Sequence, residues 1–311
     1  TWGFGASGRL GHDLGQNGDP RGDAKKPTVV QALMGRPIVR VACGYNHTAA
    51  LTIDGKMFVW GSGNTGKLGL GSITEEEECF CSIPTPVLID KNIRVRKISC
   101  GSAHTGCITD RGDLWMWGSG AGGRLGLGPR LLSTQFTPRQ VLGFDGQKVA
   151  QISCGACHTL VATTIKEVYR GEGAARVKVK IGGDCYQAGP QNVCGKFCTS
   201  FELVPGLADL SITCVSAGFN HSAVTTSSGE IFCWGNNYTG CCGKPISARF
   251  CYEPFNIRCV YERPTNIALG RNATMSSVYN GRGAYLAVDG NLDGDSEEAV
   301  TEGEHAVQHG G

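Results

Sequence analysis

The chain has 311 residues, of which 41% are hydrophobic and 18% charged, and its formal net charge is +2. This length allows two domains, and the near-neutral balance gives no reason to expect a nucleic acid or an anionic membrane as a partner. No run of about eighteen apolar residues occurs, so no membrane-spanning helix is expected. The first part of the chain also lacks the charged, apolar and small-residue order of a signal peptide.

Residues 43–61 contain a pattern that recurs along the chain. We predict a strand, a tight turn at Asp54-Gly55 and a second strand that ends in Trp-Gly. Four histidines hold the same place in successive copies, at spacings of 57, 54 and 63 residues. A shared period of this kind indicates a repeat architecture. The repeated residues are His47, His104, His158 and His221, with the pairs Trp60-Gly61, Trp117-Gly118 and Trp234-Gly235, while Ala188-Gly189 stands in the remaining copy.

The stretches between these motifs complete one period. Residues 12–27 are predicted to form a polar loop, and residues 27–30 and 38–41 are predicted to be strands because they are rich in β-branched residues. In the next copy, residues 86–88 and 93–98 are predicted to be strands in the same way. The period therefore contains four short strands. Such a unit cannot bury its apolar faces alone and must pack against copies of itself.

Glycine-rich segments follow the Trp-Gly pairs. Residues 3–8, 61–66 and 118–123 each match the pattern Gly-x-Gly-x-x-Gly. A dinucleotide-binding loop of this pattern occurs once and opens a helix, with an acidic residue about twenty positions further on. Here the pattern recurs with the period and leads into Leu-Gly, so we predict turns between strands and no nucleotide site.

Period and motifs together resemble the regulator-of-chromosome-condensation repeat over about residues 1–245, because Trp-Gly, Leu-Gly-x-Gly and Cys-Gly-x-x-His-Thr agree in successive copies. This resemblance implies an all-β, seven-bladed β-propeller, in which four-stranded sheets close into a ring. About four copies are present, and the first starts inside its own motif at Trp2-Gly3. We therefore expect a partial, about four-blade propeller that forms an open arc, within a segment of a longer protein.

The repeated histidines and cysteines allow more than one interpretation. A histidine near a cysteine can act as the base for a nucleophile. Repetition in four copies favours a structural role instead, with the imidazole bonded to backbone or hydroxyl groups. Cys43, Cys100 and Cys154 share their position with Ala217, which indicates a small buried group. Cys154 and Cys157 leave a structural zinc site open, whereas reduced thiols in a cytoplasmic protein are the other interpretation, which we favour.

The third copy carries an insertion of about seventeen residues near 165–181. A solvent-exposed β-hairpin is one interpretation of it, and a basic surface for an acidic protein partner is the other. The copy that follows lacks Leu-Gly-x-Gly, so its sheet is predicted to be irregular. The basic residues of the insertion are Lys166, Arg170, Arg176, Lys178 and Lys180.

The C-terminal part shows a second resemblance. After a predicted linker at residues 246–264, residues 265–311 resemble the opening of an F-type lectin or coagulation-factor discoidin domain. This resemblance implies an incomplete jelly-roll β-sandwich, with Asp289 and Asn291 as candidate calcium ligands, since calcium prefers oxygen donors. The residues that grip sugar in such relatives would lie beyond Gly311.

Three functions follow as expectations. The first is a non-enzymatic scaffold that binds a protein partner; no catalytic or cofactor-binding residues are predicted. The second is guanine-nucleotide exchange on a small GTPase, which the propeller resemblance implies. The third is calcium-dependent glycan recognition by the C-terminal module. Plant ultraviolet photoreceptors resemble the repeat but place tryptophan before the histidine, where this chain has Tyr-Asn, Ser-Ala, Ala-Cys and Phe-Asn, so photochemistry is not expected.

Overall fold

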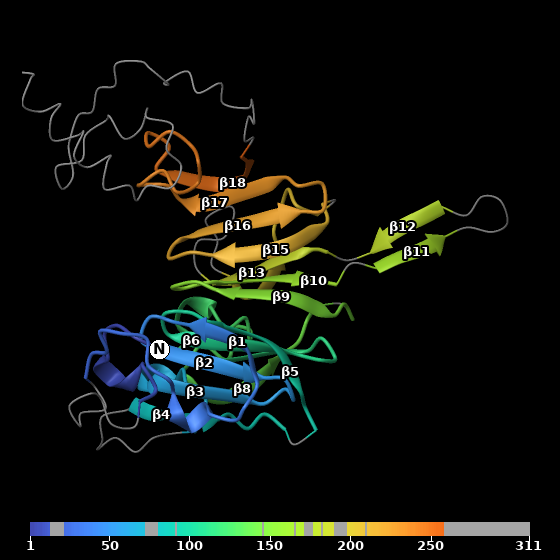
Figure 1. The fold of residues 1–311 in the computed structure, drawn as a ribbon. Coiled ribbons are helices and arrows are strands. Elements are labelled where there is room, and N and C mark those ends of the chain that lie inside the picture. Colours follow the sequence, from blue (N-terminus) through green and yellow to red (C-terminus); the bar gives the residue numbers. More distant parts are fainter. Residues whose placement is uncertain are drawn as a thin grey trace, which may run out of the picture. The chain divides into compact units, whose positions relative to one another are not determined.

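The computed structural model contains four antiparallel sheets of four strands each and one separate two-stranded hairpin among the residues that it describes (Figure 1). All of these residues belong to one compact unit, Thr1–Arg258. No helix in this part of the chain has the length and apolar character needed to cross a bilayer. The described residues are 1–12, 22–71, 80–90, 92–144, 146–164, 166–170, 177–181, 183–189, 198–208 and 210–257, with the backbone alone at 166–170 and 177–181.

Each sheet is built from one consecutive stretch of the chain. The first contains β1 (Ile38–Cys43), β2 (His47–Thr52), β3 (Met57–Ser62) and β4 (Phe80–Pro86). The second contains β5 (Val95–Cys100), β6 (His104–Thr109), β7 (Leu114–Gly118) and β8 (Gln135–Val141). The third contains β9 (Val149–Cys154), β10 (Thr159–Thr163), β13 (Cys185–Gly189) and β14 (Cys198–Leu203). The fourth contains β15 (Ile212–Ala217), β16 (His221–Thr226), β17 (Ile231–Asn236) and β18 (Phe250–Asn256).

The pairing of the strands confirms the repeat. His47 is paired with Gly61 across β2 and β3, and the same register pairs His104 with Gly118 in the second sheet. The register to the fourth strand shifts at the glycine that follows the tryptophan. Gly61 has φ +105°, and a Cβ there would lie 2.6 Å from the carbonyl oxygen of Asn46. Only glycine tolerates both the positive φ and the close approach of this carbonyl, which explains why the tryptophan is followed by glycine.

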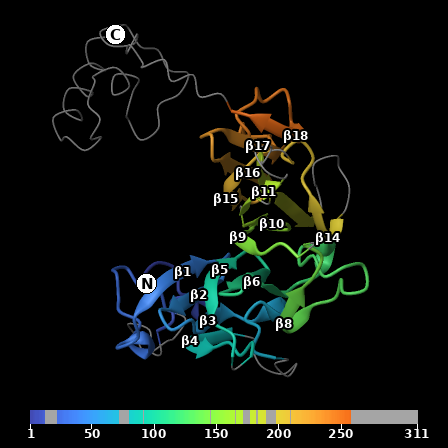
Figure 2. The same cartoon turned by 90° about the vertical axis from the view of Figure 1, so that its right-hand side faces the viewer.

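The hydrophobic core lies between neighbouring sheets; the first and second sheets overlap in Figure 1 and lie next to each other in Figure 2. Leu51 and Val59 of the first sheet share one cluster with Cys107 and Trp117 of the second, and Trp117 is fully buried. Burying a large apolar side chain contributes about 1.5–3 kcal/mol. A single sheet would leave these side chains in water, so neighbouring copies stabilise each other, as the period predicts.

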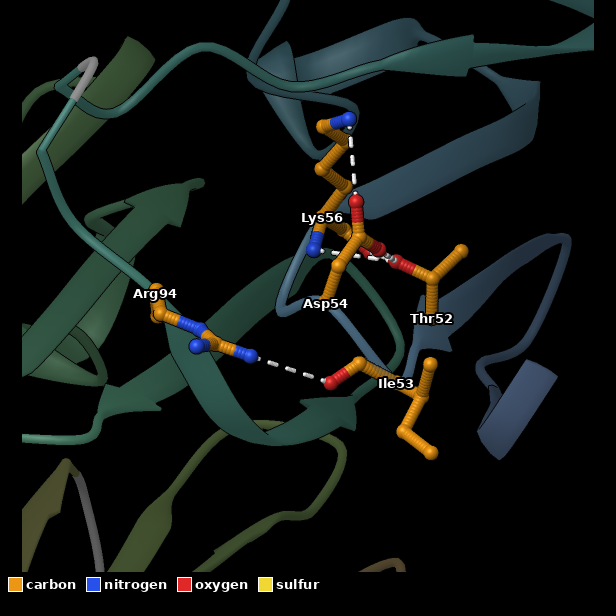
Figure 3. Close-up of polar contacts among 5 residues, drawn as sticks. All are labelled: Thr52, Ile53, Asp54, Lys56 and Arg94. Carbon is orange, nitrogen blue, oxygen red and sulfur yellow. Dashed lines mark hydrogen bonds and ion pairs between the residues drawn. The ribbon is translucent and has the colours of Figure 1, made fainter. Parts of the chain in front are cut away.

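The turn at Asp54-Gly55 joins β2 and β3 as predicted (Figure 3). The Thr52 hydroxyl donates a hydrogen bond to the Asp54 carboxylate and accepts one of 3.0 Å from the backbone N–H of Lys56. Lys56 Nζ lies 2.9 Å from the same carboxylate. Arg94, which precedes β5, donates to the carbonyl of Ile53 at 3.3 Å. The tip of one sheet is thus attached to the chain that enters the next.

The third sheet keeps a regular order despite its insertion, β14-β13-β10-β9, with antiparallel pairing throughout. The fourth sheet, which the sequence predicted to be irregular, has the order β15-β16-β17-β18 and is also antiparallel throughout, so that prediction is wrong. The hairpin β11 (Lys166–Arg170) and β12 (Val177–Ile181) accommodates the insertion between β10 and β13 and projects from the sheet (Figure 1). This pairing confirms the predicted hairpin. Extra residues at a turn leave the strand pairing on both sides intact, which explains the regular sheet.

Residues 27–30 differ from the prediction, since no strand forms there. Gly3 and Ala24 exchange backbone hydrogen bonds of 2.7 and 2.9 Å, and Thr28 N–H donates to the Thr1 carbonyl at 3.0 Å. This spacing repeats the pairing of β3 with β4. The segment 24–28 is therefore attached to residues 1–3 by separate backbone hydrogen bonds and not by a continuous ladder.

Two further segments complete the comparison with the sequence. The Gly-x-Gly-x-x-Gly stretches contain single 3₁₀ turns, η1 (Ala6–Gly8), η3 (Asn64–Gly66) and η4 (Ala121–Gly123), and none of them opens an α-helix. A fourth such turn, η2 (Gln31–Leu33), precedes β1. β18 lies within residues 246–264, the predicted linker, and completes the fourth sheet. The lectin-like segment at 265–311 lies outside the described residues.

Candidate functional site

Three of the four repeated histidines join one sheet to the next through side-chain hydrogen bonds. His47 Nε2 lies 2.8 Å from Thr105 Oγ1, and His104 Nε2 lies 2.9 Å from Thr159 Oγ1. The third bond joins His158 Nε2 and Ser222 Oγ at 3.0 Å. All three imidazoles are buried. Each histidine therefore takes part in the junction between its own sheet and the next.

The hydroxyl groups at these junctions determine the tautomer of the rings. Thr105 Oγ1 donates its one proton to the carbonyl of Lys67 at 2.7 Å, and Thr159 Oγ1 donates to the carbonyl of Arg124 at 2.8 Å. Each hydroxyl must therefore accept from the imidazole, which assigns the proton of His47 and His104 to Nε2. Nδ1 of both rings is buried without a hydrogen-bond partner among the described residues. A second proton on Nδ1 of His47 would have no acceptor there.

Burial also favours the neutral form of these three imidazoles. It lowers the pKa of His47 to about 3, with a smaller contribution from the cation of Lys67. Burial, followed by the neighbouring His221, lowers the pKa of His158 to about 4. The pKa of His104 is lowered well below its ordinary value by burial and then by Arg124. These histidines are therefore neutral near pH 7 and poorly matched to general acid–base catalysis there.

Two of the repeated cysteines, Cys100 and Cys154, are buried and lack the thiolate that a nucleophile needs, whereas Cys43 is exposed, so the prediction of a small buried group is wrong at that position. Burial raises the pKa of Cys154 to about 12, although the nearby hydroxyl groups of Ser99 and Thr159 oppose the shift. The pKa of Cys100 is raised well above its ordinary value, also mainly by burial. The pairing of a histidine base with a cysteine nucleophile, which the sequence left open, gains no support from these environments.

The tryptophans belong to the same junctions. Trp117 Nε1 donates to the carbonyl of Lys67 at 3.0 Å, and this is the oxygen that also accepts from Thr105. In the first sheet, Trp60 Nε1 and Thr48 Oγ1 both donate to the carbonyl of Arg9, at 2.9 and 3.1 Å. In these two Gly-Arg/Lys-Leu-Gly turns the carbonyl thus accepts from an indole and a hydroxyl, whereas the carbonyl of Arg124 in the third turn accepts from the Thr159 hydroxyl. Trp234 instead donates to Gln187 Oε1 at 2.9 Å.

The third sheet has Ala188 in place of this tryptophan, and an aromatic residue of another strand occupies the space. A Cβ on Gly69 would lie 2.7 Å from the indole nitrogen of Trp117. The equivalent Cβ on Gly126 would lie 2.3 Å from the ring of Phe201, which belongs to β14. Phe201 is buried and packs against Phe144. No repeated motif in the sequence indicates this replacement, because Phe201 belongs to a different strand from Ala188.

The glycines before the histidines allow the sheets to approach closely. A Cβ on Gly44 would lie 2.5 Å from the carbonyl oxygen of Gly101, and one on Gly101 would lie 2.4 Å from that of Gly155. Tyr45 N–H donates to Gly101 O and Ser102 N–H donates to Gly155 O, both at 3.2 Å. A side chain at these positions would push the sheets apart.

Serines that precede the repeated cysteines accept a further hydrogen bond between neighbouring sheets, which the sequence predictions did not include. Cys154 N–H donates to Ser99 Oγ at 2.9 Å, and Ala217 N–H donates to Ser153 Oγ at 2.8 Å. The signal was present, since serine recurs at the same place in the second, third and fourth copies. Position 42 of the first copy is alanine, which lacks the hydroxyl.

The two residues between glycine and histidine form a short loop at each junction, in which Tyr45 and Phe219 are exposed and Ala156 is buried. We define the loop surface as residues 44–46, 101–103, 155–157 and 218–220. Tyr45 and Phe219 are 73% and 68% exposed. The backbone beneath is held by Arg9, which donates to the carbonyl of Tyr45 at 3.2 Å, and by Arg124, which donates to that of Ala156 at 3.0 Å. Variable side chains are thus presented on a backbone whose position is defined.

The other predicted site residues are found as follows. His221 lies in β16, is half-buried, and contacts Gly218 of its own loop. Asp289 and Asn291, the candidate calcium ligands, lie outside the described residues. Among the described residues, no three His, Cys, Asp or Glu side chains lie together as metal ligands would. The candidate site is therefore the loop surface.

Comparisons with known proteins agree with this architecture. A family model for the RCC1-like domain matches residues 1–288, a range that includes the first part of the segment that resembled a lectin. The chain is 31% identical over 264 residues to the ultraviolet-B receptor UVR8 of Arabidopsis thaliana, which covers 80% of this chain and 53% of the receptor. It is 33% identical over 242 residues to the human E3 ubiquitin-protein ligase HERC2, covering 77% of this chain and 4% of the ligase.

Solved structures show the same fold. Human WBSCR16 has a TM-score of 0.64 at 23% identity, covering 81% of this chain and 60% of WBSCR16. Yeast RCC1 (Prp20), in its complex with Kap60, has a TM-score of 0.64 at 21% identity, covering 82% of this chain and 56% of RCC1. The chain spans about half of the plant receptor and a small part of the ligase.

Proposed function

The chain belongs to the RCC1-like domain family, and we propose that it is a non-enzymatic module that binds a protein partner through its loop surface. One observation carries this proposal. Glycine and histidine are the same in all four loops, whereas the residues between them are Tyr-Asn, Ser-Ala, Ala-Cys and Phe-Asn. Variable loop residues on a rigid frame are typical of recognition surfaces.

The chemistry of the repeated residues supports binding over catalysis. His47, His104 and His158 are buried, and their bonds to hydroxyl groups join the sheets. Tyr45 and Phe219, by contrast, are exposed aromatic residues on short loops. Aromatic residues are enriched among the residues that dominate binding energy at protein interfaces.

The test begins with a partner that co-purifies with the chain and is then purified itself. The double variant Tyr45→Ser/Phe219→Ser is compared with Leu88→Ser, which removes an 85% exposed leucine that follows β4, at the opposite ends of the strands. The double variant should weaken binding by roughly tenfold or more, and the control should leave it unchanged. Equal dissociation constants for the wild type and both variants would show that the loop surface is not the binding site.

Guanine-nucleotide exchange on a small GTPase is a second candidate function. The similarity in fold to Prp20p favours it, since the structure of that yeast protein was described together with its binding to Gsp1p and histones; the TM-score is 0.62 at 22% identity. The test is release of a fluorescent GDP analogue from purified GTPases, with and without the chain. Acceleration that depends on chain concentration would support exchange, and an unchanged release rate would reject it for the GTPases tested.

The finer architecture is also a proposal. We propose that the four sheets belong to a seven-bladed ring in a longer protein, because the chain corresponds to 56% of yeast RCC1 and 60% of WBSCR16. Glycan recognition with calcium at Asp289 and Asn291 remains a prediction for residues outside the described part. A glycan array in the presence of calcium or a chelator tests it. A cytoplasmic location is likewise a prediction from the abundance of cysteine.

A further inference from the structure

The first strands of the sheets bring basic side chains together. β1, β5, β9 and β15 contact one another in this order. Arg40, Lys97 and Gln151 occupy the same register position in successive sheets, opposite Leu51, Ile108 and Ala162. Arg96 is the neighbour of Lys97 on β5. We call Arg40, Arg96 and Lys97 the basic cluster.

Lys97 has a polar partner but no counter-charge. Its Nζ donates to Gln151 Oε1 at 2.7 Å, and Gln151 Nε2 donates to the Thr213 carbonyl at 3.2 Å. An ammonium group has three protons to donate, and a neutral amide oxygen compensates none of its charge. In the part of the chain that the structure describes, the only carboxylate in an ion pair is that of Asp54, whose partner is Lys56.

The electrostatic environment of Lys97 is positive. Burial lowers its pKa, and the charges of Arg40 on β1 and Arg96 on its own strand lower it further. Gln151 on β9 is neutral, and Cys214 on β15 opposes the shift only slightly, as the last of the contributions. Cations that repel one another inside a partly buried site gain most from an added anion, because the local dielectric constant is low.

A cleft adjoins the basic cluster. It encloses about 230 Å³, and its lining includes Arg96, Lys97, Asp110, Lys148, Gln151 and Thr164. Three cations therefore face one carboxylate. This volume is smaller than the roughly 300–1,000 Å³ of typical small-molecule sites. It suits one or two inserted side chains.

We propose that the basic cluster and its cleft bind an acidic, Asp- or Glu-rich segment of a protein partner, a proposal that deepens the function proposed above. Carboxylate side chains supply both the missing charge and acceptors for the free ammonium protons. A net charge of +2 and the compactness of this cluster argue against nucleic acid as its ligand, since nucleic acid requires an extended basic surface along its backbone.

The test uses the 311-residue chain and a fluorescein-labelled octaglutamate peptide, followed by fluorescence anisotropy. An octaglutamine peptide is the neutral counterpart, and a single-stranded oligothymidylate tests nucleic acid. The octaglutamate peptide should bind, with an affinity that falls as salt screens the charges, and the octaglutamine peptide should not. Equal binding of the two peptides, or tighter binding of the oligothymidylate, would overturn the proposal.

Variants locate the site. Arg96→Gln/Lys97→Gln should weaken octaglutamate binding roughly tenfold or more, and Lys97→Arg should retain it because the charge remains. Arg139→Gln is the matched control, since Arg139 is an exposed cation on β8, the fourth strand of the same sheet. Arg40→Gln should also weaken octaglutamate binding, and because Arg40 is exposed this variant can be used if the double variant unfolds. If Arg40→Gln and the folded double variant both bound octaglutamate as tightly as the wild type, the site would be rejected. Binding of a partner at the loop surface should not change in these variants, so the two proposals can fail independently.

Discussion

Phe201 of the third sheet covers Gly126, just as Trp117 of the second sheet covers Gly69. The indole comes from the second-to-last strand of its sheet, whereas the phenyl ring comes from the last strand and fills the space left by Ala188. The space at this junction is thus filled by a tryptophan in one copy of the repeat and by a phenylalanine from a different strand in another.

Phe201→Ala should destabilise the protein by about 3–5 kcal/mol, because it leaves a cavity beside Gly126 that no neighbour fills. Urea unfolding measures the change. Ala188→Trp alone should also destabilise, by about 1–3 kcal/mol, since two rings would compete for one space. Combining the two should cost less than the sum of the single changes. Strict additivity would show that Phe201 does not replace the tryptophan.

Thr105→Val should cost about 1–3 kcal/mol in the free energy of unfolding. The change keeps the shape of the side chain but leaves the buried Nε2–H of His47 without its acceptor, whereas the carbonyl of Lys67 keeps its hydrogen bond from Trp117. Thr137→Val, at an exposed position of β8, is the control and should change stability by less than about 0.5 kcal/mol. A small effect at Thr105 would mean that water replaces the hydroxyl.

Stability should fall as the pH falls below about 6.5. The folded-state pKa is about 3 for His47 and about 4 for His158, both lower than in the unfolded chain. Between these values and 6.5 the unfolded chain binds more protons, so the free energy of unfolding decreases by up to about 1.4 kcal/mol per pH unit for each histidine. His104 acts in the same direction. Urea titrations at a series of pH values measure the slope.

His47→Gln tests the origin of this slope, because the amide can still donate to Thr105 but does not titrate. The slope between pH 6.5 and 4.5 should decrease by about one third, since one of three histidines is removed. Asp54, whose pKa is lowered to about 2 chiefly by the Thr52 hydroxyl, also loses a stabilising contribution in acid. That loss occurs below about pH 4 and is therefore separable. An unchanged slope would mean that His47 titrates normally in the folded protein.

Iodoacetamide should distinguish the cysteines by burial. Cys43 and Cys214 are exposed and should be alkylated first. Cys107 and Cys185 are fully buried, burial raises the pKa of both, and they should react only on unfolding. Mass spectrometry of peptides from native and urea-treated protein measures the order. Rapid labelling of Cys107 in the native protein would contradict the packing between the first two sheets.

The sequence by itself determined the period, the strand pairs and the turn at Asp54-Gly55, because these depend on contacts between residues close in the chain. It also predicted that the sheets must pack against one another, since their apolar faces are repeated. It predicted a strand at residues 27–30, where the pattern is β-branched but only separate backbone hydrogen bonds to residues 1–3 form. Local propensity does not decide such a pairing, because strand formation depends on the tertiary context.

The tertiary structure alone decided which groups meet between sheets. Three examples join residues of different sheets or turns that are far apart in the chain. They are the hydrogen bond of His47 with Thr105, the packing of Phe201 on Gly126, and the proximity of Arg40 to Lys97. A repeated motif shows that such positions are equivalent, but their partners depend on the distance and angle at which successive sheets pack. That geometry arises from the whole core, and no single copy of the repeat contains it.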